Sequence, residues 1–207
     1  MHETVFLVDD DPAIRESICD LLDSAGIRTC CYSSAEEFLS QLSSASQGCL
    51  LLDVRLPGMS GMELQGLLLE RRVALPIILM TAHGDIPMVR KALKSGAVEF
   101  LTKPFQDREL LDSVRQAFTL NRTSRESEAA FQSIHQRMQT LTQREMQVLE
   151  LVTAGLTNKE IGQKLHLSIV TIKLYRGQVM RKMQAESFAD LVKFWQTVHP
   201  AEPHKDK

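Results

Sequence analysis

Two groups of acidic residues follow short apolar segments that lie far apart in the sequence. Asp9, Asp10 and Asp11 come directly after residues 4–8, and Asp53 comes directly after residues 49–52. A short apolar run before a turn signal is typical of a strand buried on both faces of a parallel sheet. Ligands bind at the carboxyl ends of such strands, so we expect the carboxylates to lie together. Unit charges about 4 Å apart repel by roughly 1–4 kcal/mol, so the cluster requires a cation, and oxygen ligands favour Mg²⁺.

Two further polar residues end later apolar segments. Thr81 follows residues 76–80, and Lys103 follows residues 98–102. By itself Thr81 could cap a turn, and Lys103 could form an ion pair at the surface. Beside an acidic cluster, a hydroxyl group and an ammonium group are suited to phosphoryl transfer, with Asp53 as the nucleophile. The cations offset charge on the transferring group, and the hydroxyl donates a hydrogen bond to it.

The elements that must position these residues alternate regularly. We expect strands near residues 4–8, 27–32, 49–53, 76–81 and 98–102, each followed by a segment with helical periodicity. Pro12 suits the first turn of the first helix, and Ser34 with Glu37 forms a capping box before the second. Five strands that alternate with five helices predict an α/β fold with a doubly wound, five-stranded parallel sheet.

The two parts of the chain differ in net charge. Residues 1–120 contain 17 acidic and 11 basic residues, a net charge of −6. Residues 121–207 contain 9 acidic and 13 basic residues, a net charge of +4. At 207 residues the chain is long enough for two domains. We therefore expect a second domain that binds an anionic partner.

Composition also indicates where the protein works. No apolar segment approaches the roughly 20 residues of a membrane helix, and the amino terminus has no signal-peptide pattern. We expect a cytoplasmic protein with no membrane partner. The four cysteines, Cys19, Cys30, Cys31 and Cys49, show neither metal-binding nor redox spacing, so we expect buried, reduced thiols.

The second part of the chain is rich in helix caps. Thr142 with Glu145 and Thr157 with Glu160 form capping boxes, and serines precede two later helical segments. The caps predict four helices near residues 143–154, 158–165, 169–183 and 188–198. Only three residues separate the second helix from the third, which is the spacing of a helix-turn-helix. The preceding residues, 121–139, have helical character; a continuous helix or a solvated linker both fit the pattern.

The third of these helices has one apolar side and one basic side. At about 100° per residue, Ile172, Val179 and Met183 share the side that packs. The opposite side carries Leu174, Gly177 and Arg181, with Lys173 beside them. Arg176 lies on the flank of the packing side, where it is suited to an ion pair or a phosphate contact more than to reading a base. No acidic residue occurs between residues 168 and 183. The basic side is either the solvated face of a structural helix or a face that enters the major groove of DNA.

The first part of the chain resembles the receiver domain of two-component response regulators. The motifs are VDDD at 8–11, LLDVRLPGMSG at 51–61, TAHGD at 81–85 and KPF at 103–105. The resemblance implies that Asp53 accepts a phosphoryl group from a sensor histidine kinase, with Lys103 and Thr81 in the same site. It implies that Mg²⁺ is bound by Asp9, Asp10, Asp53 and the backbone carbonyl of Arg55. It also implies a conformational switch formed by Thr81 and Phe100, and a cis peptide bond before Pro104.

The second part resembles the four-helix DNA-binding domain of the LuxR class, on the segment LTQREMQVLELVTAGLTNKEIGQKLHLSIVTIKLYRGQVMRKM at 141–183. Together the two matches place the chain with the FixJ/NarL family. The resemblance implies DNA contacts from Lys159, Lys173, Leu174, Tyr175, Arg176, Gly177 and Arg181. Gly177 has no side chain with which to read a base, and Tyr175 stands where the family often has His. The last helix is similar to the family's dimer helix, although it could equally pack within its own domain.

The resulting expectation is a phosphorylation-activated transcriptional regulator and not an enzyme. We expect a receiver at residues 1–120, a helical linker at 121–139, a DNA-binding domain at 140–200 and a disordered tail at 201–207. Its partners would be a sensor histidine kinase, double-stranded promoter DNA, a second copy when phosphorylated, and RNA polymerase. Two alternatives remain open. Magnesium-dependent hydrolases also use a nucleophilic Asp, but they typically carry a second Asp where Arg55 stands. A constitutive DNA-binding protein would use the receiver only for contacts.

Overall fold

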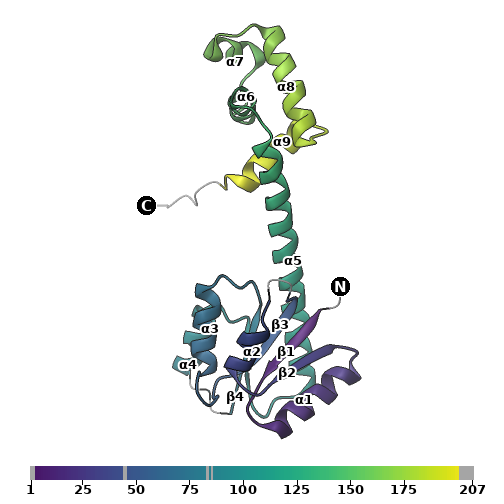
Figure 1. Cartoon of the computed structure of the whole chain (residues 1–207), viewed down its shortest axis with the longest axis vertical. Helices are drawn as coiled ribbons and strands as arrows, with labels where there is room; N and C mark the ends of the chain where they lie inside the picture. The colour runs from purple at the N-terminus through teal and green to yellow at the C-terminus, as the bar shows by residue number, and fades with distance from the viewer. Residues whose placement is uncertain (1–2, 44–45, 83, 85, 201–207) are drawn as a thin grey trace. The chain divides into compact units, whose positions relative to one another are not determined.

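The computed structural model describes residues 3–43, 46–82, 84 and 86–200, and the chain divides into two compact units, Met1–Arg125 and Glu126–Lys207. The first unit contains a parallel sheet covered by helices, and the described part of the second unit is helical (Figure 1). The tail predicted to be disordered, residues 201–207, lies outside the described residues, as do residues 83 and 85 of the TAHGD motif.

The sheet of the first unit has the strand order β2-β1-β3-β4-β5, and every neighbouring pair is parallel. The strands are β1 Thr4–Val8, β2 Arg28–Tyr32, β3 Gly48–Asp53, β4 Ile77–Thr81 and β5 Glu99–Thr102. The helices are α1 Pro12–Ser24, α2 Ala35–Gln41, α3 Gly61–Glu70, α4 Ile86–Lys94 and α5 Asp107–Gln139. The arrangement confirms the predicted fold class. It places β3 at the centre of the sheet, between β1 and β4.

Helices cover both faces of this sheet, which explains why its central strands β1, β3 and β4 are buried and almost wholly apolar (Figure 1). Cys49 and Leu51 of β3 pack with the helices α1 and α5 on one face. Leu50 and Leu52 pack with α2, α3 and α4 on the other face. Successive side chains of a strand point to opposite faces, so a strand covered on both sides shows no alternation in its sequence.

Helix α5 includes residues 121–139, for which the sequence left a continuous helix or a coil open. At the start of this segment, the Asn121 side chain is only 2% exposed. Its Oδ1 accepts a hydrogen bond from the Gly48 N–H at 3.2 Å, and its Nδ2 donates to the Ala74 carbonyl at 2.8 Å. Asn121 therefore belongs to the packing of the first unit. Further along, Ile134 belongs to the core of the second unit.

Four more helices complete the second unit, and their bounds agree with the predicted ones to within one residue. They are α6 Gln143–Thr153, α7 Asn158–Leu165, α8 Ile169–Met183 and α9 Phe188–Val198. Each begins after a Ser or Thr whose hydroxyl accepts a hydrogen bond from a backbone N–H three residues later. Such caps pair backbone donors that a helix leaves unsatisfied at its start.

The turn between α7 and α8 is tight, as a helix-turn-helix requires. The residue that follows α7, His166, caps the helix and adopts the left-handed conformation with φ of 56°. A Cβ atom on Gly162 would lie 2.8 Å from the carbonyl oxygen of Leu167 in this turn. Glycine at position 162 is therefore what allows the turn to fold back against α7.

The cysteines correct one expectation. Cys19 of α1 and Cys31 of β2 form a disulfide, so the prediction of four reduced thiols is wrong for this pair. The spacing of the two residues in the sequence gave no signal, because the packing of α1 against β2 brings them together. Cys30 and Cys49 are free thiols. Burial raises the pKa of the Cys49 thiol to about 12, which keeps it neutral.

Among the described residues, no helix combines the length and the apolar character that crossing a bilayer requires.

The second unit contains a buried carboxylate. Glu145 of α6 is 3% exposed, and its Oε2 accepts hydrogen bonds from Lys182 Nζ at 2.6 Å and from the Thr142 N–H at 2.7 Å. Burial alone would raise the pKa of the Glu145 carboxyl, but these bonds outweigh burial and hold it below its ordinary value of 4.5.

We expect Glu145→Gln to destabilise the second unit by about 1–3 kcal/mol at neutral pH, because it removes a charged acceptor of buried hydrogen bonds. A lowered folded-state pKa means that the charge of Glu145 stabilises the fold above pH 4.5, and that this contribution disappears as the pH falls through the folded-state pKa. The difference between wild type and variant should therefore shrink below pH 4.5. Urea unfolding followed by the fluorescence of Trp195, the single tryptophan, measures it.

The matched control is Glu160→Gln. Glu160 completes the same kind of capping box with Thr157, but it is exposed and has no lysine within ion-pair distance among the described residues. Its replacement should cost clearly less. Equal losses for the two variants, or a Glu145→Gln loss that grows in acid, would contradict the assignment.

Candidate functional site

The predicted acidic cluster forms at the carboxyl edge of the sheet. Strands β1 and β3 pair in register, with Val8 opposite Leu52, so the residues that follow them are neighbours. One carboxylate oxygen from each of Asp9, Asp10 and Asp53 lies within 4.8 Å of the other two. Asp9 is fully buried and Asp53 nearly so, whereas Asp10 is exposed. The three side chains come from two strand ends and converge on one small volume.

Lys103 reaches this cluster from the end of β5. Its Nζ lies 2.6 Å from Asp9 Oδ2 and 2.5 Å from Asp53 Oδ2. Its backbone N–H donates to the Thr81 carbonyl at 2.7 Å, which joins the ends of β4 and β5. The peptide bond between Lys103 and Pro104 is cis, as the resemblance implied. The predicted group of acid, hydroxyl and ammonium residues thus lies along one edge.

The electrostatics of the cluster reflect both burial and ion pairing. Burial raises the pKa of the Asp9 carboxyl above its ordinary value, although Lys103 lowers it in part. Burial would lower the pKa of the Lys103 ammonium, but its hydrogen bonds to Asp53 and Asp9 outweigh this effect and raise the pKa. The lysine is therefore a permanent positive charge between two carboxylates.

The oxygen donors of the cluster fit a hard divalent cation, because three carboxylates at this separation carry more negative charge than one lysine offsets. The backbone at residue 55 lies beside Asp53, where the Arg55 N–H donates to Asp53 Oδ1 at 2.9 Å. Asp11 has a different part. Its side chain caps α1 by accepting hydrogen bonds from the N–H groups of Ala13 and Ile14.

Two residues of this edge were not found from the sequence. A Cβ atom on Gly84 would lie 2.7 Å from Phe100 Cε1 and 3.3 Å from Thr81 Cγ2, so Gly84 lies close to both predicted switch residues. Glu36 of α2 accepts a hydrogen bond from the Met59 N–H at 3.1 Å and so holds the loop after β3. Both are contacts between distant segments, and no local pattern predicts them.

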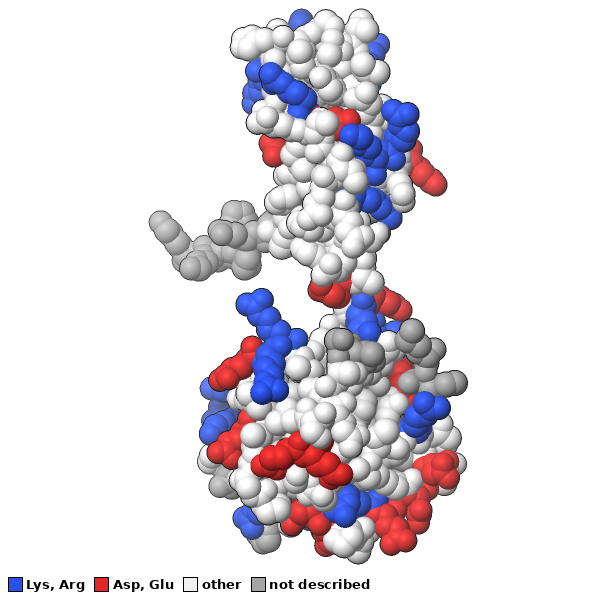
Figure 2. All heavy atoms as spheres, viewed as in Figure 1, with Lys and Arg blue, Asp and Glu red and all other residues white. Residues whose placement is uncertain are grey.

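The predicted DNA-contacting residues divide into two groups. The exposed ones are Lys159 in the first turn of α7 and Lys173, Leu174, Gly177 and Arg181 on α8. Tyr175 is half-buried against the core of the second unit, and the half-buried Arg176 donates from Nη1 to Asn158 Oδ1 at 2.7 Å. The structure therefore does not place Tyr175 or Arg176 on the exposed face. Within the helical unit labelled α6 to α9 in Figure 1, the visible side in Figure 2 shows more basic than acidic side chains.

Comparison with known proteins matches both parts of the chain. Residues 5–115 match the response regulator receiver domain, and residues 139–195 match bacterial regulatory proteins of the luxR family. Nodulation protein W of Bradyrhizobium diazoefficiens is 42% identical over 203 residues, which cover 98% of this chain and 89% of that protein. Response regulator protein TodT of Pseudomonas putida is 41% identical over 189 residues, which cover 91% of this chain and 83% of that protein.

Two solved structures of response regulators are similar to nearly the whole chain. The response regulator StyR has a TM-score of 0.85 and 43% identity, covering 95% of this chain and 99% of that one. Full-length FixJ from B. japonicum has a TM-score of 0.59 and 41% identity, covering 95% and 97%. The fold and the acidic edge define a signal-receiving domain that is joined to a DNA-binding domain. The chain belongs to the response regulators with a LuxR-type helix-turn-helix domain, a family of transcriptional regulators.

We expect Asp53→Asn to abolish labelling by a small phosphodonor in the presence of Mg²⁺, because an amide is a poor nucleophile. The wild-type chain should gain one base-labile acyl phosphate, measured by intact mass and by peptide mapping. Asp11→Asn is the matched control: it keeps a side chain that can cap α1, and it should still be labelled. Undiminished labelling of the Asp53→Asn chain would refute the assignment.

Proposed function

We propose that Asp53 accepts a phosphoryl group from a sensor histidine kinase and that this modification controls promoter binding by the second unit. The observation that carries the proposal is the convergence of Asp9, Asp10, Asp53 and Lys103 on one edge. A carboxylate oxygen of Asp53 attacks phosphorus, the P–N bond to the kinase histidine breaks, and its electron pair returns to the imidazole. The Lys103 ammonium neutralises charge on the transferring group.

Asp9, Asp10, Asp53 and the backbone carbonyl of Arg55 would hold Mg²⁺, which supplies further positive charge at the phosphoryl oxygens. The kinase must bring its histidine to this edge. An apolar groove of about 580 Å³ adjoins Lys103, and its apolar lining comes mainly from Ile14, Ile18 and Leu21 of α1 and from Phe105. We assign this groove to the kinase because Lys103, which forms an ion pair with Asp53, is one of the residues that line it.

The proposed switch uses the contact between Thr81, Gly84 and Phe100. When the Thr81 hydroxyl moves toward a phosphoryl oxygen, it vacates space that the Phe100 ring can occupy. The ring belongs to the surface formed by α4, β5 and α5. Its movement therefore changes that surface in response to a charge at Asp53.

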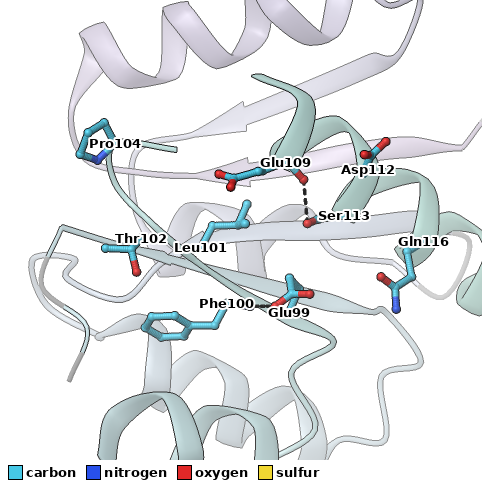
Figure 3. A pocket seen from close by; sticks show the side chains of 9 residues that line it. All are labelled: Glu99, Phe100, Leu101, Thr102, Pro104, Glu109, Asp112, Ser113 and Gln116. Carbon is cyan, nitrogen blue, oxygen red and sulfur yellow. Dashed lines mark hydrogen bonds between the residues drawn. The ribbon is translucent and has the colours of Figure 1, made fainter. Parts of the chain in front are cut away.

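This surface has the charge pattern of a self-complementary interface. A pocket of about 650 Å³ lies on this surface. Figure 3 shows Glu99 on β5 and Glu109 and Asp112 on α5 among the residues that line it. Nearby α4 carries the exposed basic residues Arg90, Lys91 and Lys94. In a two-fold interface each patch of one copy faces the opposite patch of the other, so acids meet bases twice. We propose that phosphorylation produces a homodimer through this surface.

We expect Thr81→Ala to accept phosphate on Asp53 but to dimerise poorly, because the hydroxyl that draws the segment toward the phosphoryl group is missing. Sedimentation velocity on chains with equal phosphate content, measured by mass spectrometry, distinguishes the two properties. Thr81→Ser is the matched control: it keeps the hydroxyl that Thr81→Ala lacks, so it should dimerise like the wild type. A fully phosphorylated wild-type chain that stays monomeric at high concentration would count against the switch.

In the second unit we propose that α8 lies in the major groove of promoter DNA and that Lys159 contacts phosphate. Two units brought together by receiver dimerisation share one operator, so the second binds at a high effective concentration. Phosphorylation should therefore raise affinity for paired half-sites more than for one half-site. Recruitment of RNA polymerase would follow at the promoter. The cytoplasm is the compartment that such a regulator requires.

We expect Lys173→Ala to weaken operator binding because Lys173 lies at the edge of the exposed face of α8. If Lys173 contacts a base, the loss should be about 1–3 kcal/mol and confined to one base pair. If it contacts a phosphate, binding should weaken on all sequences. The slope of the logarithm of the binding constant against the logarithm of the salt concentration should then fall in magnitude by about one. Fluorescence anisotropy across a salt series separates the two cases. A variant that keeps both its affinity and its salt dependence would show that α8 does not enter the groove.

Steady phosphatase turnover of a small substrate would favour the hydrolase alternative, and we propose that the chain lacks it, because Arg55 replaces the second acid of those enzymes. DNA affinity that does not change on phosphorylation would favour the constitutive alternative.

A further inference from the structure

The exposed face of α8 contains an apolar pair that the fold does not use. Val170 is 77% exposed and Leu174 is 61% exposed. The core of the second unit takes Ile172, Val179 and Met183 from the same helix, and these three are buried. Truncating Val170 or Leu174 would therefore remove little packing. Four residues apart on a helix, the two side chains lie next to each other and form one continuous apolar surface.

The pair occupies the centre of the face that points away from the core. At about 100° per residue, Val170, Leu174 and Arg181 each lie within about 20° of the direction opposite Ile172. Gly177 lies within about 40° of the same direction. Val170 was not among the residues that sequence reasoning selected, although the same angular count includes it.

Gly177 extends the open surface beside this pair. A Cβ atom at position 177 would meet no atom within 4 Å, so packing does not require glycine here. Glycine inside a helix costs about 1 kcal/mol relative to alanine. Its presence is explained if the backbone of α8 approaches another molecule closely at this point, where a side chain would hold the helix away.

The charges around the pair indicate what kind of molecule binds this face of α8. Lys173 lies beside it, Arg181 continues the same face, and α8 contains no acidic residue. A polyanion is therefore favoured over an apolar protein surface. Inside the major groove of DNA, the apolar group that a side chain can meet is the C5-methyl of thymine. The first turns of a recognition helix are the part that reaches base edges, and Val170 and Leu174 lie there.

We propose that Val170 and Leu174 read thymine methyl groups in each half-site, and that Gly177 allows the close approach this contact needs. The inference rests on the proposed function, since it requires α8 to lie in the major groove. It adds the chemical class of the base feature that is recognised: an apolar methyl contact in place of a bidentate hydrogen bond. Sequence preference then depends on thymine, while Lys173 and Arg181 supply attraction to the backbone.

The test uses the full-length phosphorylated chain and a duplex selected by it from a randomised library. Each thymine of the selected half-site is replaced by deoxyuridine, which keeps the pairing and the O4 acceptor but lacks the methyl group. We expect Kd, measured by fluorescence anisotropy, to rise about four-fold for each contacted methyl that is removed. Positions outside the half-sites should show no change.

Three variants assign the effect to the apolar pair. Leu174→Ala should bind the thymine and deoxyuridine duplexes with more nearly equal Kd, and Leu174→Met, which keeps an apolar side chain, should retain discrimination. Ile169→Ala is the matched control, because Ile169 is 47% exposed on the same helix but lies outside the face. Circular dichroism melts verify that all three variants fold.

The possible outcomes distinguish failure of the thymine-methyl contact from failure of the proposed function. Sequence-specific binding that is insensitive to every deoxyuridine substitution overturns the methyl contact and leaves the proposed function intact. The inference also fails if Leu174→Ala keeps the full thymine preference, as a protein-contacting patch would, or if it weakens specific and random duplexes alike, as the loss of a sequence-independent contact would. If the phosphorylated chain binds no selected duplex at all, the proposed function fails and the inference fails with it.

Discussion

The first unit depends on the placement of like charges at a single edge of the sheet. Asp9 and Asp53 are buried a few ångströms apart, and the Lys103 ammonium lies between them. Parallel pairing of β1 with β3 makes this proximity unavoidable, because register fixes where each strand ends. The fold tolerates the repulsion only by supplying positive charge from β5. The charges of these three side chains are therefore coupled, and a change at one of them acts on the other two.

The second unit depends on a different constraint, which is the low intrinsic stability of short helices. Its helices are too short to be stable alone, so caps and a shared core hold them together. The ion pair of Glu145 with Lys182 links the start of α6 to the end of α8. Lys182 therefore serves the fold, and it does not belong to the exposed basic residues of α8. Arg176 is similar, since it bonds to Asn158 of α7.

The sequence predicted the sheet, the helices α6 to α9 and the placement of Asp53, Thr81 and Lys103 at strand ends, because each depends on local periodicity, caps or strand ends. It did not predict features made by distant segments. The disulfide between Cys19 and Cys31, the bridge from Asn121 to Gly48 and the position of Gly84 against Phe100 all arise from packing. On α8 the pattern gave the correct side of the helix. Solvent exposure then separated Leu174 from Tyr175, which the family resemblance had listed together as DNA contacts.

The glycine at position 162 has a further consequence for how the DNA-binding unit acts. With no room for a Cβ atom against the Leu167 carbonyl, and with Arg176 bonded to Asn158, α7 and α8 are held at a fixed separation. The backbone positions of Lys159 on α7 and Lys173 on α8 therefore keep the same separation in every copy of the unit. The relative placement of these two helices is therefore set when the unit folds.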